Sequence, residues 1–376
     1  AVVNARLEMD IYIFGAKATA AGVYKALSAL EPEKEIKAFL VTATEQNLQE
    51  IWGCPVRALG EVSEELSDRK KAEVTVYAAV PELIHKEVKA LLERNGFTNL
   101  IMLDSYREAD VMERYFQQEG RFLSIHFLDL PEKDMVQGDL PRLTVYAASF
   151  YKDKPLENPP QMPPYVKKLY LGCDGAIRDG IEISHQASFY DNTGDHISEK
   201  NPNRCEMTAH YWVWKNRLHT DDEYVGICHY RRTLDLSDKD LRAIKGNDVD
   251  IVLPYPMLHY PNSRVHHTWY VEEKDWNLMR RVVGELYPDY ERKFDEVFDA
   301  PEFYNYNMML AKKQVFADYC AWLYPILDRI EELSEPRGDD RSDRYTAYMS
   351  ESLETLYFMT NRNNLNIYHT GRILYI

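Results

Sequence analysis

In the N-terminal part of the chain, short apolar runs alternate with stretches in which apolar residues recur at helical spacing. We predict strands and helices, in turn, at residues 11–15, 18–30, 36–41, 45–52, 74–80, 81–95 and 100–103. Strands that alternate with helices favour a parallel sheet covered by helices. We therefore expect a small Rossmann-like parallel α/β domain over residues 9–125.

A second succession of strands and helices follows a stretch without such periodicity. Glutamine, glycine and proline gather between residues 116 and 141, so we place a linker at residues 126–142. Beyond it we predict strands at 143–148, 224–228, 251–254 and 306–311, helices at 205–215 and 314–333, and a loop over the prolines at 155–164. The chain is therefore expected to be α/β throughout, with its larger domain at residues 143–376. We set residues 1–8 apart as an irregular leader.

Composition excludes several classes of protein. Of the 376 residues, 45% are apolar and 28% are charged, as in chains that bury a core. The formal charge of -16 repels polyphosphate, so no nucleic-acid partner is expected. The five cysteines lack a C-x-x-C pair, which argues against a zinc ribbon or a disulfide framework and favours a reducing cytoplasm. No uncharged apolar run approaches the ~20 residues that a membrane-spanning helix needs.

A glycine turn follows the first predicted strand, where a dinucleotide-binding fingerprint would lie. The segment from Gly15 to Gly22 carries Lys17 in place of the second glycine, whose missing side chain lets the backbone approach a pyrophosphate. The fingerprint is therefore degenerate, and a plain strand-to-helix turn is the alternative. Lys17 also argues against an oxidoreductase built on this domain.

The strand predicted at 224–228 ends in a polar run, His229, Tyr230, Arg231 and Arg232. Ligand sites of α/β proteins form at this end of a strand, and arginine donates paired hydrogen bonds to phosphate. We expect these side chains to bind phosphate without a metal ion. The alternative is that the arginines pair with the acidic residues just downstream, Asp235, Asp238 and Asp240.

The sequence does not favour a divalent metal site. Asp248 and Asp250 form an Asp-x-Asp pair, but they precede the strand at 251–254 and so lie at its wrong end. The other candidates lack a third ligand at suitable spacing; they are His259, His266, His267 and the helical pair Glu206 and His210.

Several longer segments carry a family resemblance. Residues 190–202, 205–216, 224–232 and 304–313 read YDNTGDHISEKNP, CEMTAHYWVWKN, YVGICHYRR and YNYNMMLAKK. In that order they resemble the bacterial glycosyltransferase family catalogued as domain of unknown function 4422, found in capsule, exopolysaccharide and O-antigen assembly. The resemblance runs from about Leu143 to the C-terminus. The N-terminal domain resembles the small Rossmann-like domains attached to some polysaccharide-assembly enzymes.

The resemblance implies a GT-A-like glycosyltransferase domain that uses a nucleoside-diphosphate sugar. Characterised relatives transfer galactofuranose from uridine diphosphate (UDP). We therefore expect transfer of galactofuranose from a UDP-sugar donor to a growing surface polysaccharide or its lipid-linked precursor, with inversion and without a metal ion. We expect no tightly bound cofactor, and a cytoplasmic protein with access to the inner face of the cell membrane as a peripheral contact.

Two alternatives stay open. One is the same fold with another hexose donor. The other is a non-catalytic subunit that binds a nucleotide sugar within an assembly complex. The second rests on departures from the family pattern: Ser149-Phe150 stands in place of threonine and histidine, and Ser352 in place of arginine.

Candidate binding residues follow from these segments. Donor phosphate is assigned to Ala147, Ala148 and Ser149 after the first strand of the larger domain, together with His229, Tyr230, Arg231 and Arg232. Sugar and acceptor recognition is assigned to Asn192, Asp195, Ser198, Lys200, Asn201, Trp212, Asn305 and Asn307. Short polar groups suit sugars, although turn and cap roles give the same composition. Trp212 lies off a face with core spacing formed by Met207, Tyr211 and Trp214, and the two asparagines alternate with tyrosines as on a half-buried strand.

Glu351 is the candidate general base. An inverting transfer needs a carboxylate within reach of the acceptor hydroxyl. We predict Glu351 near the N-terminus of a helix whose core face carries Leu353, Leu356 and Tyr357, where the helix dipole would lower its basicity. A purely structural role is equally open there. Asp195 is the alternative base, followed by Glu302.

Overall fold

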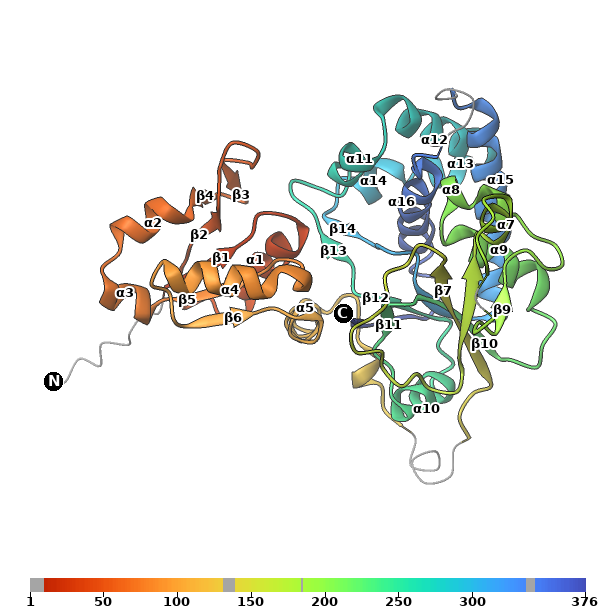
Figure 1. Cartoon of the computed structure of the whole chain (residues 1–376), viewed down its shortest axis with the longest axis horizontal. Helices are drawn as coiled ribbons and strands as arrows, with labels where there is room; N and C mark the ends of the chain where they lie inside the picture. The colour runs from red at the N-terminus through yellow and green to blue at the C-terminus, as the bar shows by residue number, and fades with distance from the viewer. Residues whose placement is uncertain (1–9, 131–138, 184, 336–341) are drawn as a thin grey trace. The chain divides into compact units, whose positions relative to one another are not determined.

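The computed structural model describes residues 10–130, 139–183, 185–335 and 342–376 (Figure 1). These residues form two compact units. The first is the chain up to Arg121 together with Met257–Ser263, and the second is Phe122–Pro256 with Arg264–Ile376. Both units are α/β, as predicted. Within the described residues, no helix combines the length and the apolar run that crossing a bilayer requires.

The first unit is a doubly wound sheet with the strand order β3-β4-β2-β1-β5-β6, parallel except for β3. Its elements are β1 (Ile11–Phe14), α1 (Ala18–Leu30), β2 (Ile36–Val41), β3 (Glu50–Ile51), β4 (Cys54–Ala58), α2 (Leu59–Glu65), α3 (Asp68–Glu73), β5 (Thr75–Ala78), η1 (Glu82–Ile84), α4 (His85–Arg94), β6 (Leu100–Met102), α5 (Ser105–Glu119) and β13 (Met257–Leu258). Along β1, Ile11 and Ile13 share a core with α1, whereas Tyr12 and Phe14 share a core with α2 and α4. The strand alternation thus buries both faces of the sheet, and the predicted Rossmann-like fold is confirmed.

The helix predicted at 45–52 is wrong. Glu50–Ile51 and Cys54–Ala58 form an antiparallel pair instead. Trp52 and Gly53 between them have φ angles of 47° and 79°. Two successive residues with positive φ make a tight hairpin turn, and this local chemistry overrides the weak helical spacing.

The glycines of the degenerate fingerprint have packing roles. Gly15 has a φ of +120°, and a Cβ atom there would lie 2.6 Å from the carbonyl oxygen of Ala79. Gly22 in α1 lies against Met112 of α5. The exposed Lys17 precedes α1 without a side-chain cap. Close approach within the unit therefore explains Gly15 without a nucleotide, whereas a Cβ atom at Gly22 would make only ordinary packing contacts, the nearest 3.7 Å from the sulfur of Met112.

The second unit is built on a mixed sheet of the order β16-β12-β15-β10-β7-β8-β9, with β11 and β17 attached beside β10. Its strands are β7 (Leu143–Phe150), β8 (Val166–Leu171), β9 (Phe189–Tyr190), β10 (Tyr224–His229), β11 (Arg232–Leu234), β12 (Ile251–Pro254), β14 (Glu302–Phe303), β15 (Met309–Lys312), β16 (Ile367–Thr370) and β17 (Arg372–Leu374). Strands β10, β7, β8 and β9 are parallel, and β15 runs antiparallel between β10 and β12. The carboxyl ends of the four parallel strands therefore meet at one edge.

Helices cover both faces of this sheet. They are η2 (Ile125–Phe127), α7 (Cys173–Arg178), η3 (Ser198–Lys200), α8 (Asn201–Arg204), α9 (Met207–Asn216), α10 (Asp238–Gly246), α11 (Val265–Tyr270), α12 (Glu273–Leu286), α13 (Pro288–Glu291), α14 (Phe294–Phe298), α15 (Lys313–Leu333) and α16 (Tyr345–Thr360). The larger core joins one sheet face to α9, α12, α15 and α16, and the smaller core joins the other face to α10. Helix α16 is buried on nearly all sides, so any polar side chain on it must find a buried partner or a cavity.

The division between the units falls earlier than the boundary predicted near residue 125. Phe122 has its ring centre 5.3 Å from that of His369 on β16. Ile125 is buried in the smaller core with Val145 of β7. Residues 131–138 of the predicted linker lie outside the described residues. The membership of Met257–Ser263 in the first unit was not predicted, since no shift in composition marks it.

Candidate active site

A cavity of about 750 Å³ lies at the carboxyl ends of β7, β8 and β10. Its lining comes from these strand ends, from the loop before β15 and from α8, α11 and α16. The lining residues are Ala148, Ser149, Phe150, Tyr151, Lys152, Asp153, Leu171, Asn201, Pro202, Cys205, Glu206, His229, Tyr230, Arg231, Arg232, His266, Tyr270, Asn305, Tyr306, Ser342, Arg344, Tyr348 and Glu351. The donor-binding candidates and the candidate base thus meet in one place, although they are far apart in the sequence.

One part of the cavity is basic. The guanidinium group of Arg231 lies 4.7 Å from the ring centre of Tyr230, and its buried Nε atom finds no hydrogen-bond partner in the described part of the chain. The guanidinium group of Arg232 lies 4.7 Å from the ring centre of Tyr306. Burial lowers the pKa of Arg232, and the charges of Arg372 and Arg231 add to that effect. An anion that binds here would offset the free-energy cost of burying these charges and would reduce their mutual repulsion.

The alternative role for the two arginines, pairing with downstream acids, does not appear in the structure. Asp240 accepts hydrogen bonds from Ser237 in a capping box at the start of α10. In the part of the chain that the structure describes, neither Arg231 nor Arg232 forms an ion pair with an acidic side chain. Burial raises the pKa of the cavity residue Asp153, and the charge of Arg231 opposes that rise. The arginines thus face the cavity without a direct ion pair among the described residues.

A second part of the cavity carries Glu351. This residue is 8% exposed and lies in the second turn of α16, further from the helix N-terminus than predicted. Its Oε1 atom accepts a hydrogen bond of 2.8 Å from the backbone N–H of Tyr306, and its Oε2 atom lies 3.2 Å from Nε2 of His266. These two partners, rather than the helix dipole, hold the carboxylate in place.

Glu206 is a cavity residue that the sequence analysis missed as a site residue. It precedes α9, and its Oε1 atom accepts a hydrogen bond of 2.7 Å from Nδ2 of Asn307. Burial raises the pKa of Glu206, and the neighbouring His229 opposes that rise. Glu206 was weighed only as half of a helical metal pair with His210. The available signal was its place directly after the polar loop and before a buried helix.

The loop between β14 and β15 organises the cavity. The prediction of a strand from residue 306 is wrong, because Tyr306 and Asn307 have φ angles of 78° and 49° and β15 begins only at Met309. His229 Nε2 donates a hydrogen bond of 2.7 Å to the carbonyl oxygen of Tyr306, and Asn305 Nδ2 lies 3.4 Å from His266 Nε2. Asn305 lines the cavity, whereas Asn307 is buried and does not line it; its side chain donates the hydrogen bond to Glu206.

The structure separates the remaining predicted residues. Ala148, Ser149 and Asn201 line the cavity. Ala147 does not, since strand alternation turns it into the smaller core with Val145.

Most of the polar loop lies outside the cavity lining, which corrects its assignment to sugar recognition. Ser198 is buried and donates a hydrogen bond of 2.6 Å to Asp191, so it has a structural role. Lys200 pairs with Glu331 at 2.7 Å. Asp195 is exposed and accepts a hydrogen bond of 3.0 Å from Tyr211, and Asn192 is likewise absent from the lining. These hydrogen bonds and this ion pair hold the loop against neighbouring elements, so the polar side chains named here have structural contacts.

Trp212 is also misplaced by the sequence analysis. Its side chain is 4% exposed and belongs to the larger core, and its Nε1 atom donates a hydrogen bond of 2.9 Å to the carbonyl oxygen of Thr193. Tyr211 and Trp214, which we expected in the core, are only partly buried. A helix with aromatic residues on most sides gives an ambiguous face, and the neighbouring sheet decided which side is buried.

The Asp-x-Asp pair is engaged elsewhere. Lys312 Nζ lies 2.7 Å from Asp248 and 2.8 Å from Asp250. Neither aspartate lines the cavity. Their position therefore agrees with the prediction that they lie at the wrong end of β12 to serve the site.

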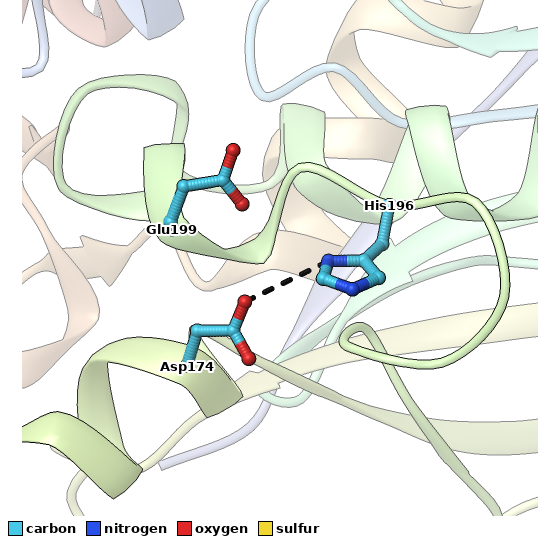
Figure 2. A group of neighbouring side chains, drawn as sticks. All are labelled: Asp174, His196 and Glu199. Atoms are coloured by element: carbon cyan, nitrogen blue, oxygen red, sulfur yellow. Dashed lines mark ion pairs between the residues drawn. The ribbon is translucent and has the colours of Figure 1, made fainter.

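A different trio of side chains has the spacing of metal ligands. Figure 2 shows Asp174, His196 and Glu199, one ligand atom of each lying within 4.8 Å of the others. His196 Nδ1 lies 3.7 Å from Asp174 Oδ2. The sequence analysis did not single out this trio, because its members are brought together by the α7 turn and the polar loop. None of the three lines the cavity, so the trio offers no direct contact with a ligand bound there.

Comparison with known proteins decides the family. The sequence model described as "Domain of unknown function (DUF4422)" matches residues 160–362, more than half of the chain. The chain belongs to the DUF4422 family. The resemblance drawn from the motifs is thus confirmed. No curated protein matches this DUF4422 chain.

Solved structures add information on the fold. The apo structure of WbbM, a bifunctional glycosyltransferase, is 26% identical to the DUF4422 chain with a TM-score of 0.52, over 62% of this chain. The match covers 45% of WbbM, so the chain corresponds to less than half of that protein. A putative oxidoreductase, yvaA from Bacillus subtilis, is 15% identical over 38% of this chain and 44% of its own, but its TM-score of 0.20 carries no argument. The mixed sheet and the WbbM likeness confirm the predicted GT-A-like α/β fold.

Proposed function

We propose that this DUF4422 chain is a glycosyltransferase of bacterial polysaccharide synthesis that uses a nucleoside-diphosphate sugar. The observation that carries the proposal is one cavity that combines the unpaired Arg231 and Arg232 with the carboxylate of Glu351. Leaving-group stabilisation needs the first feature and activation of an acceptor hydroxyl needs the second. The likeness to WbbM, a glycosyltransferase, supports the same reaction class.

The proposed chemistry is a direct displacement with inversion. The acceptor oxygen attacks the anomeric carbon while the bond from that carbon to the phosphate oxygen breaks. Glu351 accepts the hydroxyl proton, and the nucleoside diphosphate leaves with the bonding electron pair. Arg231 and Arg232 donate hydrogen bonds to the departing phosphate, each contributing about 1.5–3 kcal/mol.

Two further features suit a nucleotide donor. Ser149 and Phe150 lie at the carboxyl end of β7, beside the basic residues of β10. Phe150 and Tyr151 have ring centres 4.2 Å apart and both line the cavity, so they offer a surface on which a nucleobase can stack. The family resemblance supports UDP-galactofuranose as the donor and a saccharide or lipid-linked saccharide as the acceptor. We place the reaction in the cytoplasm, with peripheral access to the inner face of the cell membrane.

The donor is tested by a thermal-shift panel of UDP-, GDP- and dTDP-sugars, followed by turnover with a saccharide acceptor. A ligand at about 100 times its dissociation constant adds ~2.7 kcal/mol to the free energy of unfolding. We expect UDP-galactofuranose to give the largest shift. A larger thermal shift with another nucleotide hexose would identify that hexose, rather than galactofuranose, as the donor sugar. A thermal shift without any turnover or hydrolysis would favour the non-catalytic binding subunit.

The reaction is proposed to be independent of a divalent metal, because guanidinium groups occupy the strand end where an acidic metal site would serve the diphosphate. A chelator should therefore leave the rate within about twofold of the untreated enzyme. Loss of activity with the chelator, restored by Mn²⁺, would contradict this part of the proposal.

A further inference from the structure

The wall of the cavity formed by α11 and α16 is aromatic. Tyr270 ends α11 and Tyr348 lies in the first turn of α16. Their ring centres are 4.4 Å apart with an interplanar angle of 16°, so the rings are stacked. Both residues line the cavity, and Tyr270 is 46% exposed. The exposed part of the Tyr270 side chain is therefore accessible to a ligand in the cavity.

The stacked pair lies next to the candidate base through both helices. Tyr348 precedes Glu351 by one turn on α16, and Tyr270 follows His266 by one turn on α11. The ring centres of His266 and Tyr270 are 5.0 Å apart, and His266 Nε2 lies 3.2 Å from Glu351 Oε2. A molecule resting on the tyrosines would therefore present its groups to the carboxylate that removes a proton.

The chemistry of this wall fits a sugar ring rather than a nucleotide. The apolar face of a sugar ring stacks on an aromatic ring, while its hydroxyl groups need donors and acceptors at the edge. Arg344, one turn before Tyr348, lines the same cavity and carries hydrogen-bond donors. The residues suited to phosphate and nucleobase come from β7 and β10 instead.

We propose that Tyr270 and Tyr348 form the acceptor subsite, in which a saccharide ring stacks on Tyr270 with a hydroxyl directed to Glu351. The proposal rests on the proposed function of the cavity. Trp269, which is 45% exposed, lies beside this pair, with its ring centre 6.3 Å from that of Tyr270 and its plane at 81° to it. The subsite therefore takes an oligosaccharide end, with the reacting sugar on Tyr270 and the next sugar on Trp269.

Binding can be measured without transfer, which separates this proposal from the proposed function. The probes are methyl β-galactopyranoside and lactose. Their binding to the full chain, without donor, is measured by saturation-transfer NMR. We expect Tyr270→Ala to weaken binding of both probes about tenfold, since one aromatic stack is lost. Tyr270→Phe keeps the ring and should bind both probes within about twofold of wild type. Trp269→Ala should weaken lactose more than the monosaccharide.

The same variants are then assayed for hydrolysis of the UDP-sugar that gives the largest thermal shift. Tyr270→Ala should lower transfer to a saccharide acceptor more than it lowers hydrolysis of the donor, because water replaces the acceptor only in hydrolysis. An equal loss of donor binding would assign the tyrosines to the donor site and overturn the proposal. Unchanged probe binding in Tyr270→Ala, or no probe binding to the wild-type chain, would overturn it as well. Absence of both transfer and hydrolysis, with intact probe binding, would instead contradict the proposed function.

Discussion

In the first unit the carboxyl end of β1 is closed by the chain itself, with Gly15 held against the carbonyl of Ala79. In the second unit the carboxyl end of β10 carries His229 and two arginines that face a cavity. The two edges have the same parallel-strand origin. They differ in their buried polar atoms: among the described residues, the second edge holds one without a hydrogen-bond partner, Arg231 Nε, and the turn after β1 holds none.

The cores repeat this contrast. The sheet of the first unit is packed with apolar side chains on both faces. The second unit buries Arg204, Glu302, Glu351 and Glu354. Burying a charge costs free energy unless it is paired, so chains keep such groups mainly where they serve a site. The difference indicates that the chemistry belongs to the second unit, and that stability of the first unit comes from ordinary packing.

The largest effect that this contrast predicts is that of the substitution Glu351→Gln. It keeps the shape of the side chain and removes the proton acceptor, so turnover should fall ~100-fold or more while donor binding is retained. Initial rates and a thermal shift with donor measure the two quantities. Glu332→Gln, an exposed glutamate on α15, is the control and should be active. If Glu351→Gln turns over normally while Asp195→Asn is inactive, the base is Asp195.

The next effect compares the two sheet edges directly. Arg231→Ala and Arg232→Ala should each lower kcat/KM about 30-fold, which corresponds to ~2 kcal/mol from a lost charge-assisted hydrogen bond. Lys17→Ala removes a cation at the edge of the first unit and should leave kcat/KM within about twofold. Circular dichroism checks that the variants are folded. Equal losses at both edges would mean that the first unit takes part in donor binding.

A stability effect should follow from Glu354, which is buried on α16 and has no hydrogen-bond partner for either carboxylate oxygen among the described residues. Burial raises the pKa of Glu354, and the neighbouring Glu351 and Glu206 raise it further. The folded state therefore keeps a proton that the unfolded state releases above pH ~4.3. As pH rises from there towards the folded-state pKa, the free energy of unfolding falls by up to ~1.4 kcal/mol per pH unit.

Glu354→Gln removes this penalty, so its gain in melting temperature over wild type should grow between pH 5 and pH 8. Melting curves at both pH values measure the gain. Glu332→Gln serves as the exposed control and should show no such growth. An equal gain at both pH values would mean that Glu354 does not titrate differently in the folded state.

The smallest expected effect concerns the first unit. Reduced nicotinamide adenine dinucleotide at millimolar concentration should not change the melting temperature. Gly15 is held against Ala79, and the side chain of Lys17 stands where a dinucleotide-binding turn needs glycine. A clear stabilisation would break the contrast between the units and restore a dinucleotide site.

The sequence predicted those elements whose pattern is local and strong. The apolar runs of β1, β2, β5, β7, β10 and β12 and the clean amphipathic spacing of α15 all match their predicted places. The hairpin at Trp52 and Gly53 was missed because two residues set the turn against weak helical spacing. The face of α9 was missed because aromatic residues surround it, and only the sheet decides which of them is buried.

Within the site, strand ends were predictable and partnerships were not. The rule that ligands bind at the carboxyl ends of parallel strands led to His229 and the arginines. The polar loop was misleading, because short polar residues build turns as readily as binding sites. Glu206 and the aromatic wall escaped notice, since they depend on the hydrogen bond from Asn307 and on the stacking of Tyr270 on Tyr348, which no local pattern records.

The loop between β14 and β15 also bears on how this family can diverge. Tyr304 N–H donates to Thr355, Asn305 reaches His266, Tyr306 N–H donates to Glu351, and Asn307 donates to Glu206. Four consecutive residues thus each meet a different group, so inserting or deleting a single residue would displace all of these contacts at once. We expect related chains to vary freely in the length of the proline-rich loop at 155–164 while keeping this loop at constant length. New acceptor or donor preferences would then arise by substitution around a fixed frame rather than by loop growth.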